Sequence, residues 1–381
     1  KMKIKSLLLG SAAASMLAVS GAQAADPIIY AEPEAMEYVR ICDVYGAGYY
    51  YIPGTETCLQ ISGYVWYQMA ANTYRNATHT PAYIGGSNPL DNNRWYKSSR
   101  ARVNFDARSE TELGTLRSYI RVQADWQANG VANDGAAAID QAFIELGGLR
   151  MGYTEGAWVT SQSAGVAQFG SHSWSGLYYG YQQRQLIAYT FTGANGLHAT
   201  LSIENDTVGG HAAAVPFYGN GYMPDVVGVI GINQAWGGAW LKAGFDERIN
   251  ATQSAFGLQA GVQVNVPNAP GSSLRVIGFY ASGDTQYSAS TPLGRSPTWS
   301  ILGSYRHTFT PQFAATIGAQ YFADLYNAQS RVRTNQKGWA AEAAVIWTPV
   351  TNFEVRAEYG YTKMDTLSGT HSGFLRFTRT F

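Results

Sequence analysis

Arginine side chains recur at alternate positions in two neighbouring stretches of the sequence. Arg100 and Arg102 alternate with apolar residues, and a second alternating stretch carries Arg117 and Arg121. Because two residues is the side-chain period of a β-strand, we expect two strands that carry their guanidinium groups on one face. Guanidinium groups bind carboxylates and other anions. A row of them that faces acids across a narrow aqueous passage would act on passing ions through its electric field.

Like charges at this density repel each other unless carboxylates or water compensate them. We expect Arg150 and Arg356 to join the same face, and we select Asp140 and Glu145 as acids of that face. The other nearby carboxylates are those of Asp106, Asp125, Glu354 and Glu358. The alternative is a solvated wall that exerts no selectivity, and the sequence leaves both interpretations open.

Residues that could carry out a reaction are scattered along the chain. The six histidines form neither an HxxxH motif nor a set with cysteine at metal-ligand spacing, and no G-x-S-x-G motif occurs. We therefore expect no metal, no cofactor and no reaction. The partners of a serine–histidine triad can lie far apart in a chain, so an enzyme stays open as an alternative.

Alternation of apolar and polar residues continues through most of the chain and predicts β-strands of roughly ten residues each. Short turns rich in Gly, Pro or Asn are expected at 112–115, 147–148, 193–196, 237–238, 267–272, 310–312 and 349–352. Longer polar segments alternate with them, at 73–98, 129–137, 156–182, 206–224, 250–253, 284–297, 326–336 and 365–369. These seven turns join fourteen strands, and one more strand at each end makes sixteen. The pattern is weakest near 138–155 and 225–235, where both faces are apolar.

The first residues have the features of a secretory signal peptide. Lys3 and Lys5 give a positive region ahead of a short apolar run at 7–19, and Ala22-Gln23-Ala24 is a small-x-small cleavage site. We expect residues 1–24 to be removed. The whole sequence has 26 basic and 26 acidic residues. Removal of the three lysines of the signal leaves 23 against 26, a net charge of −3, which does not favour a nucleic-acid partner.

Two cysteines, Cys42 and Cys58, are the only ones in the chain. In an oxidising compartment such a pair predicts one disulfide, and two free thiols are the alternative. The bond would staple a hairpin or loop ahead of the first long strand. We therefore divide the mature chain into a stapled periplasmic segment at 25–57 and a barrel at 58–381.

The chain finishes in an alternating strand with Phe377 and Phe381 on its more apolar face. A terminal aromatic residue on such a strand is typical of bacterial outer-membrane β-barrels, where it serves as an assembly signal. After the signal, no run of 18 apolar residues occurs that could form a spanning helix. Strands in lipid must close on themselves, so the sequence predicts an all-β transmembrane antiparallel barrel of sixteen strands. A barrel of this width holds an aqueous channel.

The segment 156–182 follows the fifth predicted strand and is rich in glycine, hydroxyl groups and aromatic rings. Long segments without secondary structure are usually functional. We expect this one to fold into the barrel and narrow it, with Gln168 and His172 offering hydrogen bonds to solutes. The alternative is a loop that covers the outer rim.

The stretches Tyr38–Gly48 and Tyr51–Tyr64, with the ending Arg379-Thr380-Phe381, resemble the alphaproteobacterial porin family of Brucella, Bartonella and rhizobia. The resemblance implies a homotrimeric general-diffusion porin of sixteen strands with a constricting third loop. General porins usually carry acidic residues on that loop. The segment 156–182 contains none, so the resemblance leaves the ion preference open.

We therefore predict a passive outer-membrane channel for ions and small hydrophilic solutes, in contact with the lipid bilayer. Two other classes stay open. One is an outer-membrane barrel enzyme, which needs a prearranged catalytic group on its rim. The other is a structural or adhesive surface barrel whose lumen is plugged.

Overall fold

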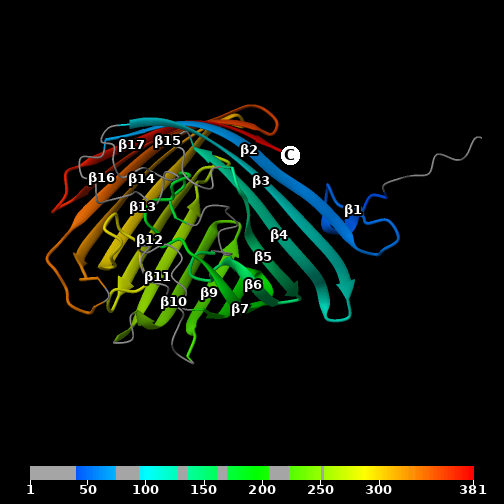
Figure 1. Cartoon of the computed structure of the whole chain (residues 1–381), viewed down its shortest axis with the longest axis horizontal. Coiled ribbons are helices and arrows are strands. Elements are labelled where there is room, and N and C mark those ends of the chain that lie inside the picture. Colours follow the sequence, from blue (N-terminus) through cyan, green and yellow to red (C-terminus); the bar gives the residue numbers. More distant parts are fainter. Residues whose placement is uncertain are drawn as a thin grey trace, which may run out of the picture. The chain divides into compact units, whose positions relative to one another are not determined.

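In the part of the chain that it describes, the computed structural model has seventeen strands in one antiparallel sheet, and sixteen of them, β2 to β17, form a closed barrel (Figure 1). In chain order, the first strands are β1 (Tyr50–Tyr51), β2 (Cys58–Asn72), β3 (Arg94–Thr111), β4 (Gly114–Gln127), β5 (Ala137–Leu146), β6 (Leu149–Glu155), β7 (Gln183–Thr192), β8 (Leu197–Glu204) and β9 (Asp225–Gln234). The others are β10 (Gly237–Ile249), β11 (Gln253–Asn265), β12 (Ser273–Ala281), β13 (Pro297–Thr310), β14 (Phe313–Leu325), β15 (Gly338–Val350), β16 (Phe353–Met364) and β17 (Thr370–Thr380). The predicted fold class and strand number are confirmed.

The structure describes residues 40–73, 94–127, 135–160, 170–205, 223–249, 253–328 and 330–381. The predicted signal peptide at 1–24 lies outside these residues. Two short 3₁₀ turns, η1 (Asp43–Tyr45) and η2 (Ala194–Gly196), are the helical elements of the described part. No helix within those ranges has the length and apolar character needed to cross a membrane.

The barrel closes where its last strand pairs with its first long strand. Strand β17 runs antiparallel to β2, with Ser372 opposite Asn72 and Thr380 opposite Tyr64. Each remaining barrel strand pairs with its neighbours in sequence, and β1 adds a two-residue pairing at the start of β2. Because no edge of the barrel sheet is left open, every strand can exchange main-chain hydrogen bonds on both sides.

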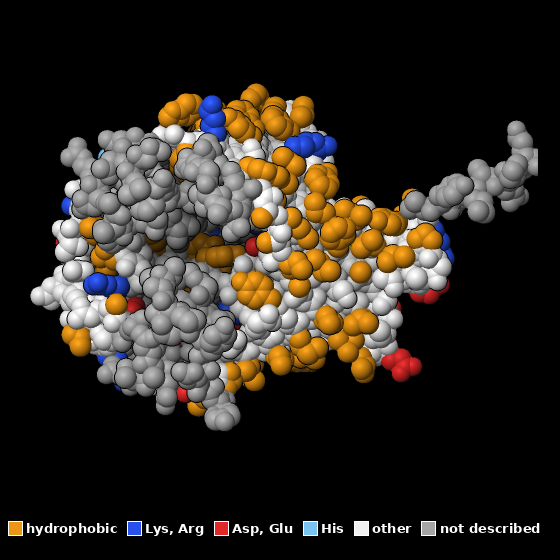
Figure 2. Space-filling view, viewed as in Figure 1, with side chains coloured by type: hydrophobic (Ala, Val, Ile, Leu, Met, Phe, Trp, Pro, Cys, Tyr) orange, Lys and Arg blue, Asp and Glu red, His pale blue; other side chains and the backbone are white. Residues whose placement is uncertain are grey.

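Side chains alternate between two faces along each strand, as the sequence pattern requires. The outer face exposes large apolar side chains, such as Ile61, Phe105, Leu241, Ile317 and Trp347. Figure 2 shows such side chains spread over the surface of the strands. The opposite face, called the polar face below, carries buried or half-buried charged and polar groups. Apolar groups on the outer face suit lipid, which explains why the alternation is so regular.

The seven predicted turns are all present in the described part of the chain, whereas several of the predicted longer segments lie mostly outside it. One turn lies two residues earlier than predicted, because Ala235 and Trp236 form it and Gly237 already begins β10. Gly237 has φ = 138°, and a Cβ there would lie 1.9 Å from the Gln263 carbonyl oxygen. The glycine is therefore needed for close approach to β11. Strand β3 also begins earlier than expected, at Arg94 and not after residue 98.

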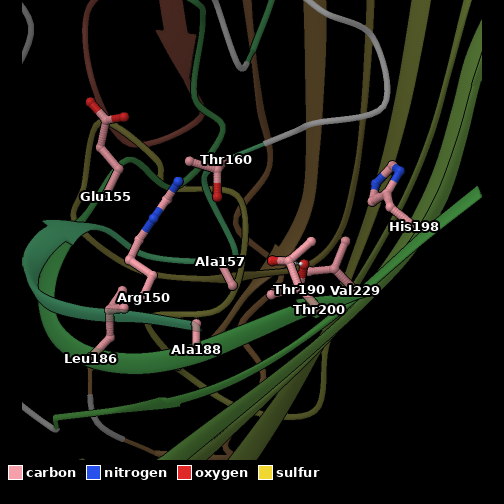
Figure 3. A pocket seen from close by; sticks show the side chains of 10 residues that line it. All are labelled: Arg150, Glu155, Ala157, Thr160, Leu186, Ala188, Thr190, His198, Thr200 and Val229. Atoms are coloured by element: carbon pink, nitrogen blue, oxygen red, sulfur yellow. Dashed lines mark hydrogen bonds between the residues drawn. The ribbon is translucent and has the colours of Figure 1, made fainter. Parts of the chain in front are cut away.

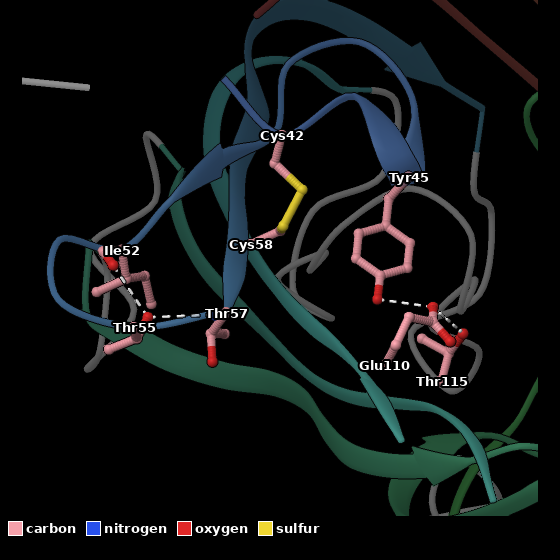
Figure 4. Close-up of a disulfide and its surroundings, with 8 residues drawn as sticks. All are labelled: Cys42, Tyr45, Ile52, Thr55, Thr57, Cys58, Glu110 and Thr115. Atoms are coloured by element: carbon pink, nitrogen blue, oxygen red, sulfur yellow. Dashed lines mark hydrogen bonds between the residues drawn. A yellow bond between two sulfur atoms is a disulfide. The ribbon is translucent and has the colours of Figure 1, made fainter. Parts of the chain in front are cut away.

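The N-terminal segment is stapled to the barrel as predicted (Figure 4). Cys42 and Cys58 form a disulfide with their Cα atoms 6.0 Å apart. The bond lies next to η1, whose Tyr45 hydroxyl donates to Glu110 at 2.7 Å. Inside the stapled loop, the Thr55 hydroxyl donates to the Ile52 carbonyl oxygen at 2.9 Å. The disulfide and the Tyr45–Glu110 hydrogen bond hold this segment against the start of β2 and the end of β3.

Candidate functional site

The predicted arginine rows lie side by side on the polar face of β3 and β4. The register places Arg100 opposite Asp125 and Arg108 opposite Arg117. Arg100 binds Asp125 through two hydrogen bonds, of 2.6 Å from Nε and 3.2 Å from Nη2. This bidentate geometry is the strongest form of guanidinium–carboxylate pairing, and it holds both groups in place.

Acids bridge the arginines at the end of the rows nearer the short turns. Asp106 accepts from Arg108 at 2.9 Å and from Arg117 at 2.8 Å. Glu145 accepts from Arg117 at 2.8 Å and from Arg150 at 2.6 Å. The result is a chain of alternating charges from β3 to β6, which relieves the repulsion among the guanidinium groups.

Arg102 and Arg121 share one carboxylate. Arg121 forms a hydrogen bond with Asp140, which lies 3.6 Å from Arg102. Arg102 has its close contacts with the neutral amide of Gln123, at 3.0 and 2.5 Å. Arg121 also lies 3.5 Å from Glu155. Four of the predicted arginines, with Arg150, therefore lie in two neighbouring sets of ion pairs, one that includes Asp140 and one that includes Glu145; together these sets are called the arginine–carboxylate network below.

Arg356 belongs to a different part of the polar face. It lies on β16, where it pairs with Glu354 at 2.8 Å and stands opposite Arg376 of β17. Arg376 was missed by the sequence analysis. Its guanidinium lies between the rings of Trp66 and Trp174, at 4.7 and 4.4 Å from their centroids. Its hydrogen bonds go to Gln68, at 2.8 and 2.5 Å.

Residues 170–182 are attached to the polar face of the later strands. Trp174 and Ser175 each donate a main-chain N–H to the Glu358 carboxylate at 2.9 Å. The Ser175 hydroxyl donates to Glu342 at 2.8 Å, and the Ser171 hydroxyl also donates to Glu342. Glu342 and Glu358, on β15 and β16, are thus the acceptors for a set of donors on this segment.

His172 is buried in the same attachment. Its two ring nitrogens lie 2.7 Å from the Ser304 hydroxyl and 2.8 Å from the Ser273 hydroxyl. Burial lowers the pKa of His172 to about 3, and the charges of Arg275 and Arg306 act in the same direction. The imidazole is therefore neutral near pH 7. Gln168, the other predicted hydrogen-bonding residue, lies outside the described residues.

The turn at residues 156–160, which begins this segment, is fixed by hydrogen bonds to side chains of two barrel strands. Glu204 of β8 accepts the Ala157 N–H at 2.8 Å. Lys242 of β10 donates to the carbonyl oxygens of Trp158 at 2.7 Å and Thr160 at 2.8 Å. Lys242 is completely buried, so its ammonium depends on these carbonyl groups for solvation.

A second segment, residues 282–296, also lies against the polar face. The Tyr287 hydroxyl lies within hydrogen-bond distance of the Asp225 carboxylate, at 3.0 Å, and of the Glu204 carboxylate, at 3.2 Å, and its ring packs edge-on against Trp158. A Cβ at Gly244 would lie 2.4 Å from the Tyr287 ring, so the strand needs glycine there. The two segments meet where the Gly180 N–H donates to the Ser290 hydroxyl at 3.3 Å.

Apolar residues of the polar face form a core beneath these two segments. Trp158, Leu177 and Tyr287 pack in one buried cluster with Val227 and Val229 of β9. This packing explains why β9 looks apolar on both faces. Strand β5 also carries an apolar residue, Phe143, on its polar face, but for a different reason. The Phe143 ring lies 5.3 and 5.1 Å from the guanidinium carbons of Arg117 and Arg150 and makes cation–π contacts with them.

The polar face therefore has two regions of different character. From β8 to β16 it is largely covered by residues 156–160, 170–182 and 282–296, and from β3 to β6 it carries the arginine–carboxylate network. In the described ranges no three His, Cys, Asp or Glu residues gather as metal ligands would. The chemistry on offer is electrostatic and hydrogen-bonding.

Comparisons with known proteins agree with this architecture. Residues 26–373 match the Porin subfamily. The chain is 34% identical to Porin Omp2b of Brucella abortus and 35% identical to that of Brucella neotomae, with each alignment covering all of both chains.

Three solved structures share the fold. The DcaP channel of Acinetobacter baumannii has a TM-score of 0.64 at 12% identity, covering 87% of this chain and 99% of its own. OmpF of Salmonella typhi, in complex with daunomycin, has 0.59 at 10% identity, covering 86% and 98%. OmpT of Vibrio cholerae, in a trimer form, has 0.54 at 8% identity, covering 86% and 100%. The fold rests on these structures and the family on the sequence matches, and the chain therefore belongs to the alphaproteobacterial outer-membrane porins of the Porin subfamily.

Proposed function

We propose that the barrel is a general-diffusion porin whose polar face lines a passive aqueous channel for ions and small hydrophilic solutes. A sixteen-strand barrel is too wide for its own side chains to fill. The paired arginines of β3 and β4 keep 11–27% of their side-chain surface exposed, whereas residues under the covering segments are almost fully buried. This contrast favours a passage on the side of the arginine–carboxylate network.

We infer that residues 156–182 are the constricting loop. The observation that carries this inference is the attachment of Trp174 and Ser175 to Glu358, and of Ser171 and Ser175 to Glu342. These contacts hold the segment against the wall from β15 to β16. The Trp174 ring then reaches Arg376, at the border of the network.

The polarity of this constriction differs from that usual in general porins. The loop contributes donors and no carboxylate, while the acids stand on the wall and are occupied by the loop or by arginines. We propose that Arg100, Arg102, Arg117, Arg121 and Arg150, with Asp140 and Glu145, set the field in the passage. Arg356 and His172 contribute differently, because Arg356 borders the passage and neutral His172 holds the loop.

We also propose that the porin is a homotrimer, that residues 1–24 are a cleaved signal, and that Phe377 and Phe381 form the assembly signal. The trimer is what the family resemblance implies.

Planar-bilayer conductance of the purified protein tests the central proposal. We expect stable ohmic steps in potassium chloride, with closures in threes at high voltage. Silence would contradict it and favour a plugged surface barrel. The alternative of a barrel enzyme would require turnover of a substrate that a single substitution abolishes.

A further inference from the structure

A row of directly opposed residues leads from the disulfide into the arginine–carboxylate network. Cys58 at the start of β2 stands opposite Arg108 of β3, and Arg108 stands opposite Arg117 of β4. The row continues with Glu145 of β5 and Arg150 of β6. Because opposed residues point to the same face of a sheet, the disulfide attaches the stapled segment to the polar face, close to the short turns.

The far end of this row lies beside the constricting loop. Arg150 donates to Glu145 at 2.6 Å. The Arg150 side chain extends toward Thr160, with Glu155 on the same side (Figure 3), and these three residues line one open-sided hollow next to the turn 156–160. The row therefore crosses the part of the polar face between the stapled segment and the loop, where ions pass in the proposed channel.

Arg108 shares its carboxylate with a second guanidinium. It donates to Asp106 at 3.0 and 2.9 Å, and Arg117 donates to the same carboxylate at 2.9 and 2.8 Å. Like charges on directly opposite residues repel each other. Arg117 has a second carboxylate in Glu145, at 2.8 Å. The second set of partners for Arg108 comes from the stapled segment.

Two tyrosine rings of that segment lie over Arg108. The ring centroids of Tyr49 and Tyr45 are 5.3 and 5.7 Å from its guanidinium carbon, and 5.8 Å from each other. The negative face of an aromatic ring attracts a guanidinium group, so both contacts offset the repulsion at Arg108. The rings also shield the group, whose side chain keeps 27% of its surface exposed.

The disulfide fixes the position of both rings. Tyr49 packs in one buried cluster with Cys42 and Cys58. The Cys42 N–H also donates to the Tyr49 carbonyl oxygen at 3.0 Å. Tyr45 packs against the same cluster, and Figure 4 shows its hydroxyl directed to Glu110 beside the disulfide. A covalent bond thus holds the aromatic cover on the first guanidinium of the row.

We propose that the stapled segment is a selectivity element of the channel, in which Tyr49 and Tyr45 are positioning residues for Arg108. The rings hold the guanidinium against Asp106 and shield it from passing ions. An uncovered Arg108 attracts anions more strongly, so the element lowers the anion preference of the pore. This inference deepens the proposed porin function and rests on it, because a wall charge selects ions only in an open passage.

Ion selectivity of the purified porin in planar bilayers tests the element. Tyr49→Leu removes the closer ring, and we expect the chloride-to-potassium permeability ratio to rise about twofold, measured from the reversal potential in a potassium chloride gradient. Tyr49→Phe keeps the ring and should retain the parental ratio. A parental ratio in Tyr49→Leu would overturn the proposal, and so would an equal rise in Tyr49→Phe.

Tyr51→Leu is the matched control. Tyr51 belongs to the same segment, but its ring lies over Arg40, with 4.4 Å between the ring centroid and the guanidinium carbon. We expect the parental permeability ratio in this variant. A rise equal to that in Tyr49→Leu would assign the effect to general loosening of the segment and would overturn the specific role of Tyr49.

A double variant shows whether the effect passes through Arg108. In an Arg108→Met background, Tyr49→Leu should leave the permeability ratio unchanged, because no guanidinium remains to be uncovered. A rise of the same size without Arg108 would overturn its positioning by the ring.

Replacing both cysteines with serine tests the disulfide. We expect the Cys42→Ser, Cys58→Ser variant to shift the permeability ratio in the same direction as Tyr49→Leu, because the rings are released. A parental ratio in pores of this variant would overturn the role of the disulfide. If the variant forms no pores, the Tyr49 variants decide the question.

The measurements separate the two proposals. Conductance steps with parental selectivity in every variant reject the selectivity element and leave the porin function standing. Absence of steps in the parent protein rejects the porin function itself.

Discussion

Gly63 and Phe381 exchange two main-chain hydrogen bonds across the barrel closure, of 2.9 Å from the Gly63 N–H and 3.0 Å from the Phe381 N–H. The Phe381 ring lies over the glycine, since a Cβ at Gly63 would be 3.0 Å from Cζ of that ring and 2.1 Å from the Arg102 carbonyl oxygen. The terminal aromatic residue therefore fits against β2 only because the residue opposite has no side chain.

Gly63→Ala should destabilise the barrel by roughly 1–3 kcal/mol, the usual cost of overpacking a tight contact. Urea unfolding of the refolded porin in lipid measures the change. Gly303→Ala is the matched control, because Gly303 is also in a barrel strand and its Cβ would meet nothing within 4 Å. Equal stability of the two variants would show that the closure tolerates a methyl group.

The number and order of the strands could be predicted because lipid and the polar face impose opposite polarity on successive residues. The prediction was weak where that contrast is lost. Val227 and Val229 on β9 are apolar because they pack beneath Trp158, and Phe143 on β5 because two guanidinium groups lie over its ring. Such residues follow the packing of a covering segment, which a local period cannot reveal.

The arginine–carboxylate network was partly predictable from the sequence. Alternating arginines on two neighbouring strands lie next to each other on one face of the sheet, whatever the exact register of the strands. The attachment of the loop was not. Ser171 and Glu342 are 171 residues apart in sequence, and Lys242 meets Trp158 across 84 residues. The hydroxyl-rich composition of 156–182 indicated many donors, but it did not identify Glu342, Glu358 or Lys242 as their partners.

Replacing Arg102 and Arg121 with glutamine should shift the ion selectivity of the pore toward cations. The double variant removes both guanidinium groups near Asp140, whose carboxylate then acts on passing cations without compensation. The reversal potential in a salt gradient measures the shift. Arg379→Gln is the control, because Arg379 is exposed at the end of β17 and its hydrogen bonds to described residues go to the main-chain oxygens of Asn352 and Thr380. An unchanged reversal potential in the double variant would place the narrow zone elsewhere.

Glu358→Gln should loosen the constricting loop. The carboxylate accepts the main-chain N–H groups of Trp174 and Ser175, and hydrogen bonds to a charged group contribute about 1.5–3 kcal/mol each. We expect larger and noisier single-channel conductance. Glu354→Gln, on the same strand but bound to Arg356, is the control and should leave the noise unchanged. Quiet channels of ordinary conductance in Glu358→Gln would mean that other contacts suffice to hold the loop.

Acid should weaken the attachment of the loop through His172. Its pKa is about 3 in the docked protein against 6.5 for a free histidine, so a released loop binds a proton that the docked loop does not. Docking is therefore fully stable above about pH 6.5 and weakens as the pH falls toward 3, by up to about 1.4 kcal/mol per pH unit. Channel noise from pH 7 to pH 4, compared with His172→Gln, measures this contribution. Glu342 and Glu358 also hold the loop, and the difference between the two proteins isolates the imidazole. A variant with the same pH dependence as the parent would exclude His172 as the sensitive group.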